Sequence, residues 1–264
     1  MVKARYRLSK LPETRLDTTR LAQIEQADVQ RMINGEHMHE LWRDDEQSLQ
    51  KLNFPEQALG VNAGDRRALY ALISALQPKS ILEIGTHIGV STAHIAMATT
   101  RYDNDDTPQI DTVDIVDVNV SSQALSMWKQ YHAAQSPADS MALLGVAERV
   151  KFHQSDSLVF LSDSARTYDF IFLDGDHAAS KVYQELPLAV SMLNDGGFIL
   201  LHDYYPDLKP LFSDGEVICG PYLAVSRTRK TCPDLQLVPL GKLPWQTKLG
   251  SNNTSLALLG RFAR

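Results

Sequence analysis

Two short segments in the second half of the chain place acids and histidines directly after runs of apolar residues. The segments are YDFIFLDGDH, residues 168–177, and GGFILLHDYYP, residues 196–206. Apolar runs of this kind are typical of buried strands, and open α/β sheets bind ligands beyond the carboxyl ends of their strands. An active site or a metal site is therefore predicted, and a buried hydrogen-bond network without a metal is the alternative. The ionisable residues concerned are Asp174, Asp176, His177, His202 and Asp203.

A third segment, ILEIGTHIGVST at residues 81–92, has the composition of a cofactor-binding loop between a strand and a helix. Gly85 and Gly89 allow the backbone to approach a ligand, and Ser91 opens a helix whose amides can meet an anion. The spacing is E-x-G-x-x-x-G from Glu83, which lacks the third glycine of the dinucleotide-binding G-x-G-x-x-G loop. An acid before the turn favours a cofactor with a cationic end. A tight strand-to-helix turn is the alternative role of the two glycines.

On these motifs the chain resembles class I S-adenosylmethionine-dependent methyltransferases. The endings D-G-D-H and L-L-H-D-Y are similar to those of the O-methyltransferase branch that includes catechol, macrolide-sugar and aminocoumarin-sugar methyltransferases. The resemblance covers about residues 64–262. It implies methyl transfer from S-adenosylmethionine to a hydroxyl group of a small molecule, with the cofactor bound at the positions Glu83, Gly85, Gly89, Ser91 and Asp174.

Two further segments fit the order of motifs in this family. QIDTVD, residues 109–114, ends in Asp114, in the position of the acid that binds the ribose hydroxyls, and Asp117 is the nearby alternative. VKFHQSDS, residues 150–157, places Ser155 and Asp156 beside the adenine ring, where an acid can accept the amino proton. Asp114 and Asp156 can also cap the loop or helix that follows them.

In that branch, acids at the two later strand ends hold a divalent metal, and Asp174 and Asp203 occupy these positions. The third ligand is usually Asp, Glu or Asn beside the second acid, whereas the neighbours here are His202 and Tyr204. Imidazole is a ligand for Zn, Fe or Mn and a poor one for Mg²⁺, which prefers oxygen. His202 therefore either changes the metal or indicates that none binds.

Methyl transfer to a hydroxyl requires a base, and His177 is the predicted one. An unperturbed imidazole has a pKa of about 6.5, near working pH, so it can take a proton there. Asp176, one residue earlier, is the second candidate. A metal on Asp174 and Asp203 would lower the pKa of the hydroxyl as well.

From residue 64 onwards, helix-like and strand-like segments alternate as in βαβ units, which predicts a Rossmann-like, doubly wound, mostly parallel seven-stranded sheet. In the family the last strand is antiparallel. We expect a methyltransferase domain over residues 56–264 and an N-terminal helical extension over residues 1–55. The extension contains the helix-like stretch 16–33, and we expect it to act as a lid or as a contact in a homodimer. Between the strands, helices are predicted over residues 121–134 and 179–193.

Composition and charge exclude several other classes of protein. With 264 residues, 44% of them hydrophobic, the chain can bury one large core without disulfides, and its two cysteines are expected to be reduced. A net charge of −6 argues against a nucleic-acid partner, because such binding requires a basic face. Since no apolar run reaches the roughly 18 residues of a membrane span, we expect no membrane partner and a cytoplasmic location.

Two other functions share this fold and stay open on the sequence. A nicotinamide-dependent oxidoreductase would use a similar sheet, although the absent third glycine disfavours it. A catalytically silent methyltransferase-like scaffold would keep the fold without the reaction, and fold analogy alone does not exclude it. The acceptor is equally open among a sugar hydroxyl, a catechol and a polyketide or peptide intermediate.

Overall fold

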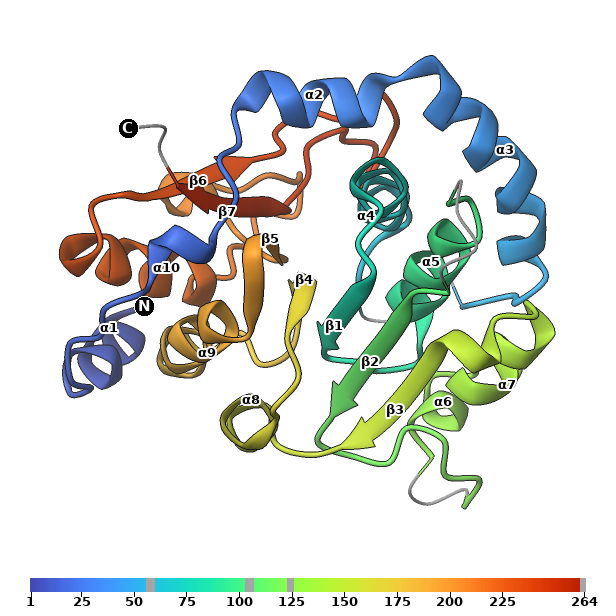
Figure 1. Ribbon diagram of the computed structural model, residues 1–264, viewed down its shortest axis with the longest axis horizontal. Helices are drawn as coiled ribbons and strands as arrows, with labels where there is room; N and C mark the ends of the chain where they lie inside the picture. Colours follow the sequence, from blue (N-terminus) through green and yellow to red (C-terminus); the bar gives the residue numbers. More distant parts are fainter. Residues whose placement is uncertain (56–59, 103–106, 123–125, 262–264) are drawn as a thin grey trace.

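The computed structural model describes residues 1–55, 60–102, 107–122 and 126–261. A seven-stranded sheet lies at its centre, and helices cover both faces of the sheet (Figure 1). The strands lie in the order β3-β2-β1-β4-β5-β7-β6, so the sheet grows in one direction from β1 to β3 and in the other from β4 onwards. The strands are β1 (Ser80–Ile84), β2 (Gln109–Asp114), β3 (Val150–Gln154), β4 (Tyr168–Leu173), β5 (Leu193–Leu201), β6 (Leu235–Pro239) and β7 (Ala257–Arg261).

The five strands β1 to β5 pair in parallel, and β7 is antiparallel to both β5 and β6. The central strands β1 and β4 are buried along most of their length, which requires the nearly continuous apolar sequences that predicted them. The predicted fold, a doubly wound and mostly parallel sheet whose last strand is antiparallel, is confirmed.

The sheet separates two hydrophobic cores, one on each of its faces, and helices cover both. One core contains Tyr70 and Phe172 under α4 and α5, and the other contains Tyr183 and Ile171 under α9 and α10. The helices after residue 60 are α4 (Ala63–Leu76), α5 (Val90–Thr99), α6 (Met127–Gln130), α7 (Pro137–Leu143), α8 (Ser157–Asp163), α9 (Ala179–Ser191) and α10 (Gly220–Thr231), with short 3-10 turns η2 (Ala147–Arg149) and η3 (Pro206–Leu208).

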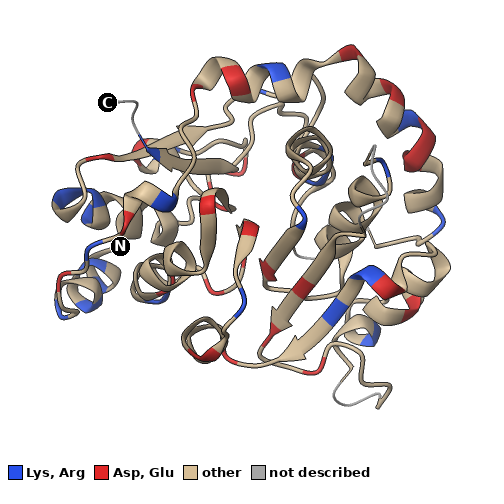
Figure 2. Cartoon of the chain, in the orientation of Figure 1, with Lys and Arg blue, Asp and Glu red and all other residues tan. Residues whose placement is uncertain are grey.

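The first 55 residues pack against both cores. They form α1 (Val2–Ser9), the 3-10 turn η1 (Thr18–Arg20), α2 (Gln26–Asn34) and α3 (Glu36–Gln50). The helix predicted over residues 16–33 is wrong in its first half, because Leu21 and Gln23 are extended and form β-bridges with Gly197 and Arg261. Leu21 is fully buried there, so the extended backbone places its apolar side chain in the interior. Figure 2 shows acidic and basic residues interspersed along α2 and α3.

Of two further predicted helices, one is much shorter in the structure and the other begins at the predicted residue. The helix predicted over residues 121–134 is reduced to α6 among the described residues, and residues 123–125 of that prediction lie outside them. A separate helix, α7, starts after Ser136, whose hydroxyl accepts a hydrogen bond from the Asp139 amide. By contrast, α9 begins at Ala179 as predicted and continues through Pro187. Within the described ranges, no helix combines the length and the apolar character that a membrane crossing requires.

Candidate active site

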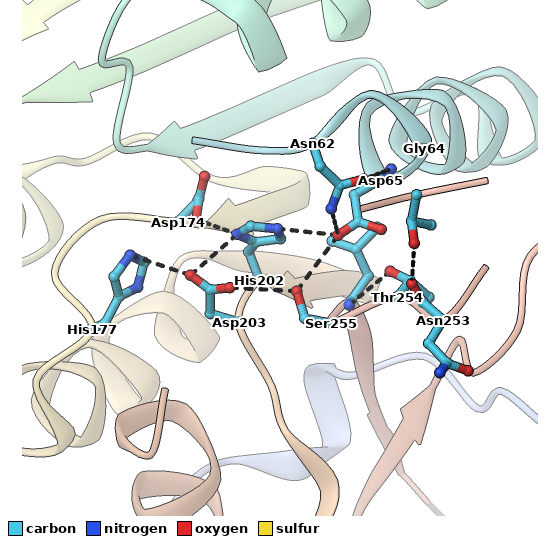
Figure 3. Close-up of polar contacts among 12 residues, drawn as sticks. Asn62, Gly64, Asp65, Asp174, His177, His202, Asp203, Asn253, Thr254 and Ser255 are labelled. Atoms are coloured by element: carbon cyan, nitrogen blue, oxygen red, sulfur yellow. Dashed lines mark hydrogen bonds and ion pairs between the residues drawn. The ribbon is translucent and has the colours of Figure 1, made fainter. Parts of the chain in front are cut away.

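The carboxyl ends of β1, β4 and β5 meet at one edge of the sheet, because β4 pairs in parallel with both of the others. Asp174 directly follows β4, and His202 and Asp203 directly follow β5. His177 lies in the loop between β4 and α9. Of the five side chains predicted from segments 168–177 and 196–206, the structure brings four together, namely Asp174, His177, His202 and Asp203 (Figure 3).

Gly85 and Gly89 have backbone conformations that favour glycine, with φ angles of +101° and +79°. A Cβ atom at Gly85 would lie 2.2 Å from the carbonyl oxygen of Asp174, and one at Gly89 would lie 2.8 Å from the Cβ of Pro137. These glycines let the loop after β1 pack against the end of β4 and against α7. The turn-forming role is thus confirmed, and their contact with a cofactor stays a prediction.

Glu83 is fully buried in β1. Its Oε2 atom accepts hydrogen bonds from the hydroxyls of Thr92, at 2.5 Å, and Thr112, at 2.6 Å. Burial raises the pKa of Glu83 to about 7 from its ordinary value of 4.5, although hydrogen bonds from neighbouring hydroxyls oppose the shift. Glu83 therefore ties β1 to β2 and to the first turn of α5, where Ser91 is also buried.

Asp114 connects the end of β2 to the loop after β1. Its Oδ2 atom accepts a hydrogen bond from the backbone amide of His87 at 2.9 Å, and Oδ1 accepts one from the amide of Val116 at 3.2 Å. Asp117, the alternative, is exposed and accepts a hydrogen bond from the amide of Asn119. Of the two acids, Asp114 is the one that contacts the glycine loop.

Asp156, which is predicted to lie near the adenine ring, also has a structural role. Its Oδ1 atom accepts hydrogen bonds from the amides of Leu158 and Val159, which caps the N-terminus of α8. Its Oδ2 atom lies 2.6 Å from Nζ of Lys181, and this hydrogen bond is the main reason why the pKa of Asp156 is lowered. Ser155 precedes it, and its amide donates to the carbonyl of Asp114 at 2.8 Å. The helix-capping alternative for Asp156 is confirmed.

His202 is buried and lies between carboxylates on both sides. Its Nδ1 atom is 2.8 Å from Oδ1 of Asp174 and 3.6 Å from Oδ2 of Asp203, and its Nε2 atom is 3.3 Å from Oδ2 of Asp65. Burial on its own would lower the pKa of His202, but the charges of Asp174 and Asp203 and the hydrogen bonds outweigh it. The pKa therefore lies well above the ordinary value of 6.5.

His177 and Asp203 form a second pair at the more open side of the site. The Nε2 atom of His177 lies 3.3 Å from Oδ2 of Asp203, and 42% of the His177 side chain is exposed, so a ligand can reach the ring. Asp176 is exposed as well and accepts a hydrogen bond from the amide of Ala178. The carboxylate of Asp203 lies beside one nitrogen of the imidazole, Nε2.

Asp203 has a φ angle of +53°, a left-handed conformation that non-glycine residues rarely adopt. Such a conformation costs on the order of 1–3 kcal/mol and persists only where neighbouring contacts hold it. Those contacts include the hydroxyl of Ser255, 3.4 Å from Oδ1 of Asp203. The strained backbone turns the Asp203 carboxylate towards both histidines.

Three residues bring their potential metal-binding atoms within 4.8 Å of one another: Asp174, His177 and Asp203. The predicted third ligand, His202, lies instead between Asp174 and Asp65, with a carboxylate facing each ring nitrogen. The donor set is therefore two carboxylates and one imidazole. Such a set suits Mn, Fe or Zn better than Mg²⁺.

The backbone of the loop that carries His177 lies in close contact with α10. A Cβ atom at Gly220, the first residue of α10, would lie 1.7 Å from the carbonyl oxygen of His177. Helix α10 can approach the loop before α9 this closely only because residue 220 has no side chain. A cavity of about 10 Å³, enough for about one water molecule, lies beneath this loop between His177, Glu185 and His202.

Sequence reasoning missed Asp65, Ser255, Lys181 and Gly220. The spacing from Asn62 to Asp65 does signal a helix start, and the Asn62 side chain does accept a hydrogen bond from the Asp65 amide. No local pattern indicates that Asp65 reaches His202, which is 137 positions away in the chain. These residues act through tertiary contacts that a motif does not encode.

Comparison with known proteins agrees with this geometry. Residues 82–204, which contain most of β1, all of β2 to β5, and both His177 and His202, match a family described as a methyltransferase domain. This segment is similar to methyltransferase domains. The resemblance to class I methyltransferases predicted from the sequence is thereby confirmed, and the match disfavours the nicotinamide-dependent alternative.

Solved structures share this fold over nearly the whole chain. The O-methyltransferase TomG from Streptomyces achromogenes, solved with S-adenosylmethionine, is 18% identical, with 94% of this chain and 100% of that chain covered and a TM-score of 0.52. An O-methyltransferase from Bacillus cereus, solved with S-adenosylhomocysteine, is 16% identical, with 90% and 96% covered and a TM-score of 0.53. No curated protein sequence matches the chain.

Proposed function

We propose that this protein transfers a methyl group from S-adenosylmethionine to a hydroxyl group of a small molecule. The observation that carries the proposal is the pair of His177 and Asp203, 3.3 Å apart and next to Asp174, at the carboxyl edge of a methyltransferase sheet. The pair provides a base at the place where open α/β sheets bind their ligands. TomG and the Bacillus cereus protein, which share the fold, are described as O-methyltransferases with the cofactor or its product bound.

The reaction is an in-line displacement. The hydroxyl oxygen attacks the methyl carbon, the new carbon–oxygen bond forms as the carbon–sulfur bond breaks, and the sulfonium becomes a neutral thioether. The hydroxyl proton goes to the imidazole of His177, whose Nε2 atom lies 3.3 Å from Oδ2 of Asp203. Holding the two reactants in line is worth up to roughly 7–11 kcal/mol of the barrier.

The residues that we propose for the cofactor surround the glycine loop. Asp114 would bind the ribose hydroxyls, since it already contacts the loop through the amide of His87. Ser155 and Asp156 would line the adenine edge, where the Asp156 carboxylate is shared with Lys181. The buried Glu83 would act indirectly, by holding the first turn of α5 through Thr92. The remaining proposed contacts are Gly85, Gly89, Ser91 and Asp174.

A divalent metal fits the donor set of Asp174, His177 and Asp203, and these residues would hold it. When bound, such a metal supplies Lewis-acid chemistry that lowers the pKa of a hydroxyl. Ligation would use the imidazole that otherwise takes the proton, so the two roles of His177 are separable by experiment. We propose the base role, because Nε2 of His177 already has a carboxylate partner.

Calorimetric titration tests the cofactor first. S-adenosylhomocysteine should bind to the purified protein, Asp114→Ala should weaken that binding, and NADH should not bind. Absence of S-adenosylhomocysteine binding would favour the silent scaffold, and tight NADH binding would favour the oxidoreductase. Equal affinity of Asp114→Ala and the unsubstituted protein would show that the ribose lies elsewhere.

Turnover with catechol and sugar-hydroxyl acceptors tests the base. His177→Ala should lower turnover about 10²–10⁴-fold while the affinity for S-adenosylhomocysteine changes little. His37→Ala, an exposed histidine on α3, is the matched control and should keep full turnover. Loss of turnover after chelation would assign His177 to a metal, whereas indifference to chelation supports the base. A homodimer, a cytoplasmic location and the role of residues 1–55 as a lid or dimer contact stay predictions.

A further inference from the structure

Asp65 lies outside the segment that matches the methyltransferase family, yet it reaches the centre of the candidate site. It belongs to the first turn of α4 and is fully buried. Its Oδ2 atom accepts a hydrogen bond from Nδ2 of Asn62 at 2.8 Å, lies 3.3 Å from Nε2 of His202 and accepts one from Oγ of Ser255 at 3.5 Å. Figure 3 shows these contacts converging on one carboxylate.

Helix capping does not explain why this acid is buried. A carboxylate in the first turn is favoured by the helix dipole, but it can gain that benefit while exposed to solvent. Burying a carboxylate costs several kcal/mol unless it is paired and hydrogen-bonded. Among the described residues, Oδ2 of Asp65 has such partners in His202 and Ser255, which come from the distant segments after β5 and before β7, whereas its buried Oδ1 atom has no hydrogen-bond partner.

His202 transmits the position of Asp65 to the opposite side of the site. With Nε2 facing Asp65 and Nδ1 at 2.8 Å from Asp174, both edges of the ring are fixed between two acids. The ring orientation in turn fixes Oδ1 of Asp174. His202 therefore sets where the Asp174 carboxylate points.

Ser255 provides a parallel connection from Asp65 to Asp203. Its hydroxyl lies 3.5 Å from Asp65 and 3.4 Å from Oδ1 of Asp203, the residue with the strained backbone. Only Oδ2 of Asp203 faces the two histidines, at 3.3 Å from His177 and 3.6 Å from His202. Ser255 thus helps to keep the correct carboxylate oxygen towards His177.

We propose that Asp65 and Ser255 are positioning residues that hold Asp174, His177 and Asp203 in their converged arrangement. They act through His202 and through the carboxylate of Asp203, and they touch no reacting atom themselves. The proposal rests on the proposed function in so far as this arrangement serves methyl transfer. The arrangement itself is a geometric property and can be measured without cofactor or acceptor.

The probe is Mn²⁺ alone, titrated against the purified full-length protein at fixed pH and followed by electron paramagnetic resonance. Asp174→Asn, which removes one of the converging donors, defines specific binding. Replacing a residue that orients metal ligands typically weakens metal affinity about 10–100-fold. We expect a loss in that range for Asp65→Asn and a smaller loss for Ser255→Ala, whose two contacts are long.

Asp45→Asn is the matched control for a merely structural effect. Asp45 is also a buried acid near the N-terminus, but it bonds Tyr70 and Arg101 and contacts none of the residues drawn in the site. This control should lower the melting temperature and leave Mn²⁺ affinity unchanged. Asp65→Asn should lower Mn²⁺ affinity even at temperatures where circular dichroism shows it fully folded.

Mn²⁺ affinity in Asp65→Asn equal to that of the unsubstituted protein would overturn the proposal, as would an equal loss in Asp45→Asn. If the unsubstituted protein retains no Mn²⁺, crystal structures of it and of Asp65→Asn decide. Movement of Asp203 out of its left-handed conformation and away from His177 supports the proposal, and unchanged geometry overturns it. Failure of S-adenosylhomocysteine to bind would instead refute the proposed function and leave these comparisons intact.

Discussion

Gly85→Ala should destabilise the protein more than an ordinary glycine substitution, because the residue faces two separate obstacles. Its φ angle of +101° is unfavourable for any residue with a side chain, at a cost of roughly 1–2 kcal/mol. The added Cβ would also lie 2.2 Å from the carbonyl oxygen of Asp174, and relieving such overpacking typically costs about 1–3 kcal/mol. Together these effects predict a loss of about 2–5 kcal/mol in the free energy of unfolding.

Urea unfolding at equilibrium measures this loss, and Gly145→Ala and Gly241→Ala separate its two parts. These glycines have φ angles of +71° and +74°, and a Cβ atom at either would meet nothing within 4 Å. The controls should therefore lose only the roughly 1–2 kcal/mol of the backbone conformation. In a chain of this size each kcal/mol corresponds to about 2–4 °C in melting temperature, so thermal unfolding should show the same ranking.

The position of Asp174 provides a second measurement. Because the overlap falls on the carbonyl of Asp174, relieving it must displace the end of β4 or the loop after β1. Mn²⁺ affinity should therefore fall in Gly85→Ala and stay constant in the two control variants. A free energy of unfolding for Gly85→Ala equal to that of the controls would refute the steric reasoning.

Two buried groups predict opposite pH effects on stability, measurable by urea unfolding from pH 4.5 to 8.5. The pKa of Glu83 is about 7 in the folded state against an ordinary 4.5, so the folded protein binds this proton more tightly than the unfolded chain does. The free energy of unfolding should therefore fall as the pH rises, by about 3 kcal/mol at pH 8. Glu83→Gln should flatten this slope. Burial lowers the pKa of His94 to about 3 from 6.5, so the unfolded chain takes up this proton first as the pH falls. The free energy of unfolding should therefore fall below pH 6.5, by about 2 kcal/mol at pH 5. His94→Phe should flatten the acidic part of the stability curve. An unchanged pH slope in either variant would contradict the corresponding assignment.

The sheet could be predicted because each central strand is specified by its own sequence. Strands buried on both faces need continuous apolar residues, and parallel strands need intervening helices, so the order of segments determines the topology. Helix α6 was less predictable, because its predicted segment of 121–134 has no periodic apolar stripe strong enough to extend it. Helix α7 does carry a readable signal, a serine cap followed by Pro137, which the prediction passed over.

The candidate site could be predicted only where its residues follow strands. Asp174, His177 and Asp203 were found because strand ends in a parallel sheet necessarily meet at one edge. The role of His202 was not predictable, since the sequence shows only a histidine next to an acid, which suggests a metal ligand. Its hydrogen-bond partners become known only from the structure. Those partners include Asp65 on α4, which is 137 positions away in the chain.

This dependence links the site to the stability of the segments that carry Asp65 and Ser255. Asp65 belongs to a helix that packs on α2 and α3, and Ser255 precedes β7, which is paired with the extended residue Gln23 through Arg261. A perturbation of the first 55 residues can therefore reach Asp203 through packed elements with no contact to a ligand. In the proposed site, the segment that matches methyltransferases would supply the reacting groups, and the flanking segments would determine whether those groups converge.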